Sequence, residues 1–243
     1  MRRLRFFILA LASLCAVACA EKETKSLLPE FETFEYEHYE DGNYAVTISY
    51  ERITNTEACE AFAIIDSMNY YSTFGEFALE TPNLQRSADM MAKETLASMD
   101  FYIEDMECEL HLYQVASLLR NNSVVCYDTV METNFGGIYP IFSQSYECYD
   151  LASGNAYDFG YLAEGEWVEA LCAALYDKMV ATYDGELLIP VTIPHIPSTI
   201  YLTDTGLTFV YQPYEIGSAD MGILSVELSD AEIAATGAPL VWE

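Results

Sequence analysis

Basic residues are scarce in this chain. Its 243 residues contain 10 lysines and arginines against 39 aspartates and glutamates, which gives a formal net charge of -29. Binding to a phosphate backbone requires clustered basic side chains that displace counterions, so we do not expect nucleic acid as a partner. The hydrophobic share of 52% is sufficient for a substantial core and excludes a disordered or fibrous chain.

Motifs for catalysis and metal binding are also missing. The three histidines, His38, His111 and His195, do not have the spacing of metal ligands. The sequence contains no nucleophile elbow, phosphate-binding glycine loop, zincin histidine pair or dinucleotide fingerprint. Carboxylates are so numerous that choosing any two as an acid–base pair carries no information. We therefore expect a protein that is not an enzyme and that holds no cofactor or metal.

One acidic cluster has the oxygen-rich side chains of a calcium site, because calcium prefers several oxygen ligands on a flexible loop. Its spacing does not match an EF-hand, and a solvated acidic face is the favoured interpretation. The cluster consists of Asp150, Asp158, Glu164, Glu166 and Glu169.

Long apolar runs are confined to the amino terminus. Three arginines precede an apolar run from Phe6 to Val17, which is too short to cross a membrane as a mature helix and has the order typical of a secretory signal. The residues Ala16-Val17-Ala18-Cys19 resemble a bacterial lipobox, so Cys19 is the predicted lipidation site. Ordinary cleavage after Ala18 or Ala20 is the alternative.

This amino terminus predicts the location of the protein. We expect residues 1–18 to be a signal peptide and residues 19–30 to be a solvated tether. The protein would then be exported to the cell envelope, most simply the outer membrane, and would touch the membrane only through its lipid anchor. Removal of residues 1–18 would change the net charge from -29 to -32, because three arginines and no acidic residue are lost.

Cysteines beyond Cys19 are odd in number, so at least one is free or pairs between molecules. If residues 123–150 form a hairpin around Gly136 and Gly137, Cys126 and Cys148 face each other and a cross-strand disulfide becomes feasible. The alternative to a disulfide, that all five cysteines are small buried hydrophobic residues, has at least equal weight. They are Cys59, Cys108, Cys126, Cys148 and Cys172.

Strand-like and helix-like segments occur in clumps along the chain. Helical periodicity or capping signals predict helices at 56–77, 84–103 and 165–179 and a short one from 229. β-rich segments predict strands within 31–50, 108–119, 124–131, 141–151, 199–211 and 221–228. Because strands and helices are grouped and do not alternate regularly as βα units, we predict an α+β fold. It should have two lobes, 31–135 and 136–243, each an antiparallel sheet covered by helices.

Charge is distributed unevenly between these lobes. From Asn121 to Glu243 there are 18 acidic residues and one basic residue, Lys178. Such a lobe projects a negative potential that attracts cationic partners and speeds their encounter. A basic protein would suit it as a partner, although acidity that serves only solubility outside the cell has about equal weight.

The carboxy-terminal sequence resembles a known family. A Gly206-Leu-Thr-Phe strand leads to Pro213-Tyr214-Glu215-Ile216, and Gly222 then opens the last strand, as in the signature of the RsiV-like domain of unknown function. Upstream, the segment from Gly136 to Pro140 resembles a turn of that family, with Tyr139 where the family usually has histidine, and Asp150 to Gly154 resembles the turn before its helix.

The resemblance implies a two-lobed exported module. Members of the family occur in lysozyme-sensing anti-sigma factors, beside polysaccharide deacetylase domains, and as free lipoproteins of Bacteroidetes-type bacteria, and this chain is similar to the third arrangement. It implies recognition of a lysozyme-like cationic protein, with Tyr139, Pro213, Tyr214 and Glu215 as candidate contacts or, alternatively, as a structural corner. A glycan-binding or accessory module of the cell surface is the alternative, with stacking residues Trp167, Tyr139, Tyr146 and Tyr149.

Overall fold

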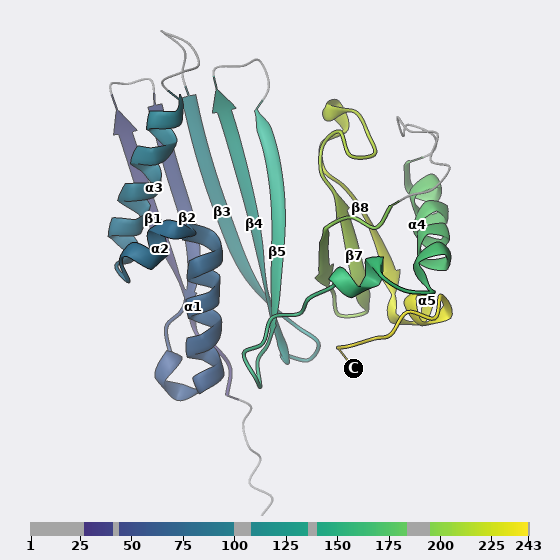
Figure 1. The fold of residues 1–243 in the computed structure, drawn as a ribbon. Coiled ribbons are helices and arrows are strands. Elements are labelled where there is room, and N and C mark those ends of the chain that lie inside the picture. The colour runs from purple at the N-terminus through teal and green to yellow at the C-terminus, as the bar shows by residue number, and fades with distance from the viewer. Residues whose placement is uncertain (1–26, 41–43, 100–107, 136–139, 184–194, 243) are drawn as a thin grey trace, which may run out of the picture.

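The computed structural model describes residues 27–40, 44–99, 108–135, 140–183 and 195–242 (Figure 1). The predicted signal peptide, Cys19, most of the tether and Tyr139 lie outside these residues. Within the described ranges, no helix is both long and apolar enough to cross a membrane.

The first lobe is a five-stranded sheet with the order β1-β2-β3-β4-β5. Its strands are β1 (Phe31–Glu40), β2 (Tyr44–Ile53), β3 (Cys108–Leu119), β4 (Val124–Phe135) and β5 (Ile141–Asp150). Neighbouring strands are antiparallel except β2 and β3, which run parallel. The prediction of an entirely antiparallel sheet is therefore wrong for this pair. The connection from β2 to β3 carries helices, and a connection of that length can return the chain to the same end of the sheet.

Helices cover one face of this sheet. The connection between β2 and β3 contains a 3-10 turn, Thr56–Ala58, followed by α1 (Glu60–Phe74), α2 (Glu76–Glu80) and α3 (Leu84–Met99). All three α-helices lie on the same side of the strands (Figure 1). The strand sequences fit this arrangement because side chains alternate between faces: Leu110 and Leu112 of β3 are buried, whereas Tyr113 is exposed.

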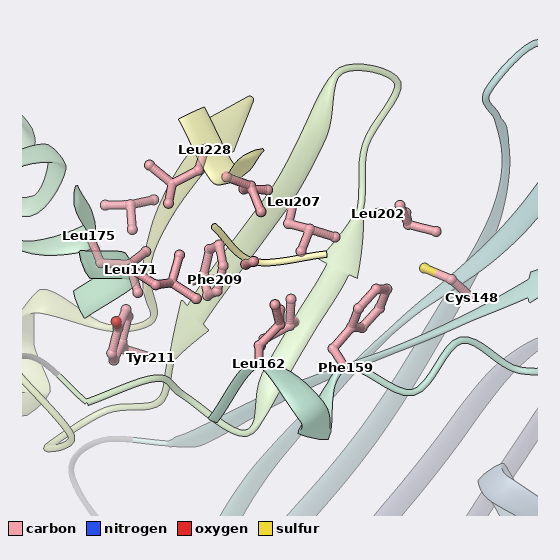
Figure 2. Close-up of a cluster of buried hydrophobic side chains, with 14 of the residues drawn as sticks. Cys148, Phe159, Leu162, Leu171, Leu175, Leu202, Leu207, Phe209, Tyr211 and Leu228 are labelled. Carbon is pink, nitrogen blue, oxygen red and sulfur yellow. The ribbon is translucent and has the colours of Figure 1, made fainter. Parts of the chain in front are cut away.

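The second lobe is a three-stranded antiparallel sheet with the order β6-β7-β8. Its strands are β6 (Thr199–Leu202), β7 (Gly206–Tyr211) and β8 (Leu224–Ser229). Its helices are α4 (Val168–Tyr183) and α5 (Asp230–Ala235), with 3-10 turns at Gly160–Ala163 and Ala219–Met221. Figure 2 shows its core, in which Leu171 and Leu175 of α4 face Phe209 and Tyr211 of β7. Together the two lobes confirm the predicted α+β class.

Part of the first sheet is buried on both faces. At one end of β4 and β5, Val124, Cys126 and Cys148 belong to the core of the second lobe, and Figure 2 shows Cys148 entering it. The intervening residues Val125 and Tyr149 pack in a separate core with α1. Cys126 and Cys148 are direct cross-strand partners with a Cα–Cα distance of 4.0 Å, and their sulfur atoms form a disulfide.

Arg120 joins the two lobes at the turn between β3 and β4. Its guanidinium donates hydrogen bonds to both carboxylate oxygens of Asp230, at 2.7 and 2.9 Å, and to the backbone carbonyls of Thr203 and Gly206. Its backbone amide donates to the carboxylate of Asp204 at 2.6 Å. A left-handed backbone at Arg120, with φ of 55°, presents these donors to the second lobe. Because β5 belongs to the first sheet, the predicted border at 135/136 falls between two strands of that sheet.

Candidate functional site

The side of the five-stranded sheet away from α1, α2 and α3, here called the open face, carries side chains from all five strands. Cross-strand register defines its members, because directly paired residues point to the same side. They are Glu35, Glu37, Tyr39, Thr47, Ser49, Glu109, His111, Tyr113, Val115, Asp128, Val130, Glu132, Phe142 and Gln144.

Apolar side chains lie exposed on the open face. Val115 is 57% exposed, Tyr113 47% and Phe142 39%. Register connects them across the sheet: Tyr113 pairs with Val130, and Phe142 pairs with Glu132, which in turn pairs with His111. Surface aromatic residues gathered with aliphatic ones are typical of the centre of a protein-binding surface.

Carboxylates surround these apolar side chains. Glu35 accepts a hydrogen bond from Ser49 at 2.9 Å, and Asp128 accepts one from the Gln144 side chain at 2.7 Å. Burial raises the pKa of Asp128 above its ordinary value, although the bonds from Gln144 and Tyr146 oppose that shift. The basic residues of the described chain lie elsewhere: Arg52, Arg86, Lys93, Arg120 and Lys178. The open face is therefore negative in character, and His111 is the one nitrogen base among its described side chains.

His111 lies in a polar environment within the open face. Its Nδ1 is 2.6 Å from the hydroxyl of Thr47 on the neighbouring strand, and its Nε2 is 3.5 Å from Glu109. The ring also stacks on Tyr113 at a centroid distance of 6.1 Å. These contacts position the ring within the sheet surface.

The second lobe covers the β5 side of the open face. Tyr146 of β5 stacks on Tyr201 of β6 with ring centroids 3.8 Å apart. The side-chain amide of Gln212 pairs with the backbone of Gln144, accepting from its N–H at 3.2 Å and donating to its carbonyl at 2.9 Å. The turn that follows Gln212 therefore lies beside the open face.

That turn contains the predicted contacts Pro213, Tyr214 and Glu215. Tyr214 is 77% exposed and has a left-handed backbone with φ of 69°. The Glu215 carboxylate accepts from the backbone amide of Gln212 at 2.7 Å and lies 2.6 Å from Nε2 of His195. Glu215 thus stabilises the turn, while Tyr214 projects from it. Tyr139, the fourth predicted contact, lies outside the described residues.

The described aromatic residues predicted for glycan stacking, Trp167, Tyr146 and Tyr149, do not share a surface. Tyr149 is buried, and Tyr146 is covered by Tyr201. Trp167 is partly buried and donates its indole N–H to the carbonyl of Leu162 at 3.2 Å. The acidic residues considered for calcium are likewise dispersed, and no group of three or more potential metal ligands occurs among the described residues.

Sequence reasoning missed the open face itself. Alternation along β3 separates the buried leucines from Glu109, His111 and Tyr113, and this signal is present in the sequence. It does not reveal that the polar faces of five strands, separated by up to about a hundred residues of chain, form one surface. That information comes from the sheet order and from the position of the helices.

The fold defines a two-lobed α+β protein in which the smaller lobe borders one face of the larger sheet. A family model described as a protein of unknown function, DUF3298, matches residues 168–230, from α4 to the start of α5. A comparison with curated proteins gave no match.

Two crystal structures are similar to this chain. A DUF3298 family member from Bacteroides fragilis has a TM-score of 0.68 and 16% identity, and the alignment covers 85% of this chain and 92% of that one. A DUF3298 family protein from Pseudomonas aeruginosa PAO1 has a TM-score of 0.61 and 12% identity, with coverage of 85% and 93%. At these identities the likeness establishes a shared two-lobed fold and not a shared activity.

Proposed function

We propose that this protein is an envelope-anchored binding lipoprotein that recognises a cationic protein, such as a lysozyme, through its open face and the adjacent Tyr214 turn. The observation that carries the proposal is the composition of the open face, where exposed Tyr113, Val115 and Phe142 lie among carboxylates without a lysine or arginine. The predicted anchor at Cys19 and the RsiV-like resemblance agree with such a role.

The arrangement favours a protein as the ligand. The open face offers apolar contact area at its centre and charged groups around it, as protein interfaces do. Carboxylates on both sides of the apolar residues accelerate encounter with a basic partner and select against acidic ones. Tyr214 adds an exposed aromatic side chain on a turn whose geometry is fixed by Glu215.

The sequence had favoured the acidic carboxy-terminal lobe as the binding region. Several of its carboxylates already have partners within the protein: Asp230 binds Arg120, Glu232 binds Lys178, and Glu215 binds Gln212. Glu37 and Glu132 of the open face form no ion pair within the described chain. We therefore assign the main contact to the open face, with the second lobe contributing mainly through the Tyr214 turn and long-range charge.

A calorimetric titration tests the proposal. The full mature chain carrying Cys19→Ser, which removes the lipid, is titrated with a basic lysozyme at low and moderate salt. We expect measurable affinity that weakens as salt rises, because exposed charges are screened. Absence of binding at both salt concentrations would contradict lysozyme as the ligand.

Two variants determine whether binding uses the open face. The double substitution Tyr113→Ser and Phe142→Ser is expected to weaken binding at least tenfold, because it removes the exposed aromatic centre. Leu79→Ser provides the control, since Leu79 is 75% exposed on α2 and lies on the helical side of the molecule. Equal affinity of both variants for lysozyme would contradict the assignment of this surface.

A further inference from the structure

The helical side of the first lobe contains a pocket that is separate from the open face. It has a volume of about 230 Å³ and lies between β2, α1 and the start of α3. Tyr50, Tyr70 and Tyr71 supply aromatic walls, and Arg52, Asp66 and Ser67 supply polar groups. Ligand pockets for drug-sized molecules start at about 300 Å³, so this one suits a ligand of about one ring.

Arg52 brings unused hydrogen-bond donors to this pocket. Within the described chain its guanidinium makes no hydrogen bond, and its ion pairs to Asp66 and Glu32 are long, at 3.7 and 3.9 Å. Its Nε is shielded from solvent and has no hydrogen-bond partner among the described residues. A shielded donor without a partner costs free energy, and a ligand acceptor beside the guanidinium would reduce that cost.

Asp66 brings an acceptor to the same place. One carboxylate oxygen accepts from the backbone amide of Ile53 at 2.8 Å, which fixes the side chain on α1 against the end of β2. The other oxygen faces Arg52 at 3.7 Å. Arg52 and Asp66 thus present donors and an acceptor side by side, and their opposite charges largely cancel at the pocket.

The aromatic walls are held in place. The Tyr70 hydroxyl lies 2.6 Å from that of Ser87 and donates to the carbonyl of Thr81 at 2.9 Å. Its ring packs at 5.3 Å from Phe74, as does the ring of Tyr50. Tyr71, the next residue, is 45% exposed and contributes a ring at the rim of the pocket. A preformed wall of this kind loses little conformational entropy when a ligand binds.

We propose that this pocket binds one ring of a neutral polyhydroxylated ligand, that is, a sugar. A hydroxyl both donates and accepts, so neighbouring sugar hydroxyls match the adjacent guanidinium and carboxylate. The C–H face of the ring would pack on Tyr71. Asp66 and the net charge of -29 disfavour an anionic ligand, and Arg52 disfavours a cationic one.

Saturation-transfer NMR on the full mature chain tests this site with defined probes: glucose, galactose, N-acetylglucosamine and the linear tetramer of N-acetylglucosamine. We expect saturation transfer to ring protons of at least one probe, with millimolar affinity. If the tetramer binds at least as tightly as its monomer, the natural ligand is the end of a glycan chain. If only monomers bind, the natural ligand is a free sugar. No transfer to any probe up to 50 mM would overturn the proposal.

Matched variants then locate the binding. Arg52→Met and Asp66→Asn are each expected to weaken the affinity at least tenfold, whereas Arg86→Met, on α3 outside the pocket, is expected to bind as the unchanged protein does. Asp66→Asn keeps an oxygen that accepts from the Ile53 amide, so this variant should retain the fold even if Arg52→Met does not. Thermal unfolding measures the stability of both variants. Unchanged affinity in Asp66→Asn would contradict the site. Lysozyme binding by these variants is expected to remain unchanged, which separates this site from the open face.

Discussion

The two faces of the five-stranded sheet differ although they share the same strands. On the covered face, Val46, Ile48 and Leu112 are almost fully buried beneath the helices. Next to them in sequence lie Thr47, Ser49 and Tyr113 on the open face, whose members are half-buried or exposed. The covered face stabilises the fold, and the open face is the proposed binding surface. Substitutions on the two faces should therefore change different properties.

The largest effect is expected on the covered face. Leu112→Ala removes a side chain that is 3% exposed and leaves a cavity in the core formed with α3. The free energy of unfolding should fall by about 3 kcal/mol. Urea denaturation followed by circular dichroism measures this change. A loss below about 1 kcal/mol would indicate that the helices do not pack tightly on this face.

A somewhat smaller loss is expected at the junction of the lobes. Arg120→Met removes the donors to Asp230, Thr203 and Gly206 and should lower the free energy of unfolding by about 2 kcal/mol. The pKa of Asp230, held below its ordinary value chiefly by the Arg120 hydrogen bonds, should rise in this variant. Denaturation and an NMR titration of the Asp230 carboxyl measure the two effects. Equal stability of Arg120→Met and Arg86→Met would contradict the structural role of Arg120.

The cap of α5 links stability to pH. Glu232 accepts from the backbone amide and hydroxyl of Ser229, and the amide bond, followed by Lys178, lowers its pKa to about 2. Because the folded-state pKa is depressed, the stabilisation is complete above the ordinary value of 4.5 and is lost as pH falls toward 2. Glu232→Ala should cost about 1 kcal/mol at pH 7. Denaturation at pH 7, 4 and 2.5 should show this difference shrinking, and a constant difference would contradict the pKa assignment.

The smallest effect on stability is expected on the open face. Val115→Thr replaces a side chain that is 57% exposed with one of nearly equal shape and good strand propensity. The free energy of unfolding should change by less than about 0.5 kcal/mol. The same denaturation measurement serves here, and a loss comparable to that of Leu112→Ala would mean that this face is packed rather than free.

Local sequence patterns predicted much of the fold. The spacing of apolar residues in 108–119 predicted β3, and the helical steps in 56–77 predicted α1, which begins at Glu60 after a 3-10 turn. Interactions between neighbouring residues decide such elements, so they can be read from a short segment. The hairpin around Gly136 also aligned Cys126 with Cys148 correctly.

Long-range pairing could not be predicted in the same way. The parallel pairing of β2 with β3 depends on where three intervening helices return the chain, which neither strand encodes locally. The same holds for the pocket, where Arg52 on β2 meets Asp66 on α1 only after the helix packs. One feature of the sequence did point to the pocket: Arg52 is one of only 10 basic residues in a very acidic chain.

A pair of charge reversals on opposite sides of the sheet tests the central claim most directly. Glu132→Lys lies on the open face, and Glu94→Lys lies exposed on α3, so both variants change the net charge by the same amount. Calorimetric titration with a basic lysozyme at low salt should show at least tenfold weaker binding for Glu132→Lys and a change of less than threefold for Glu94→Lys. Equal weakening by the two substitutions would mean that overall charge attracts the partner, and the open face would then not be the binding site.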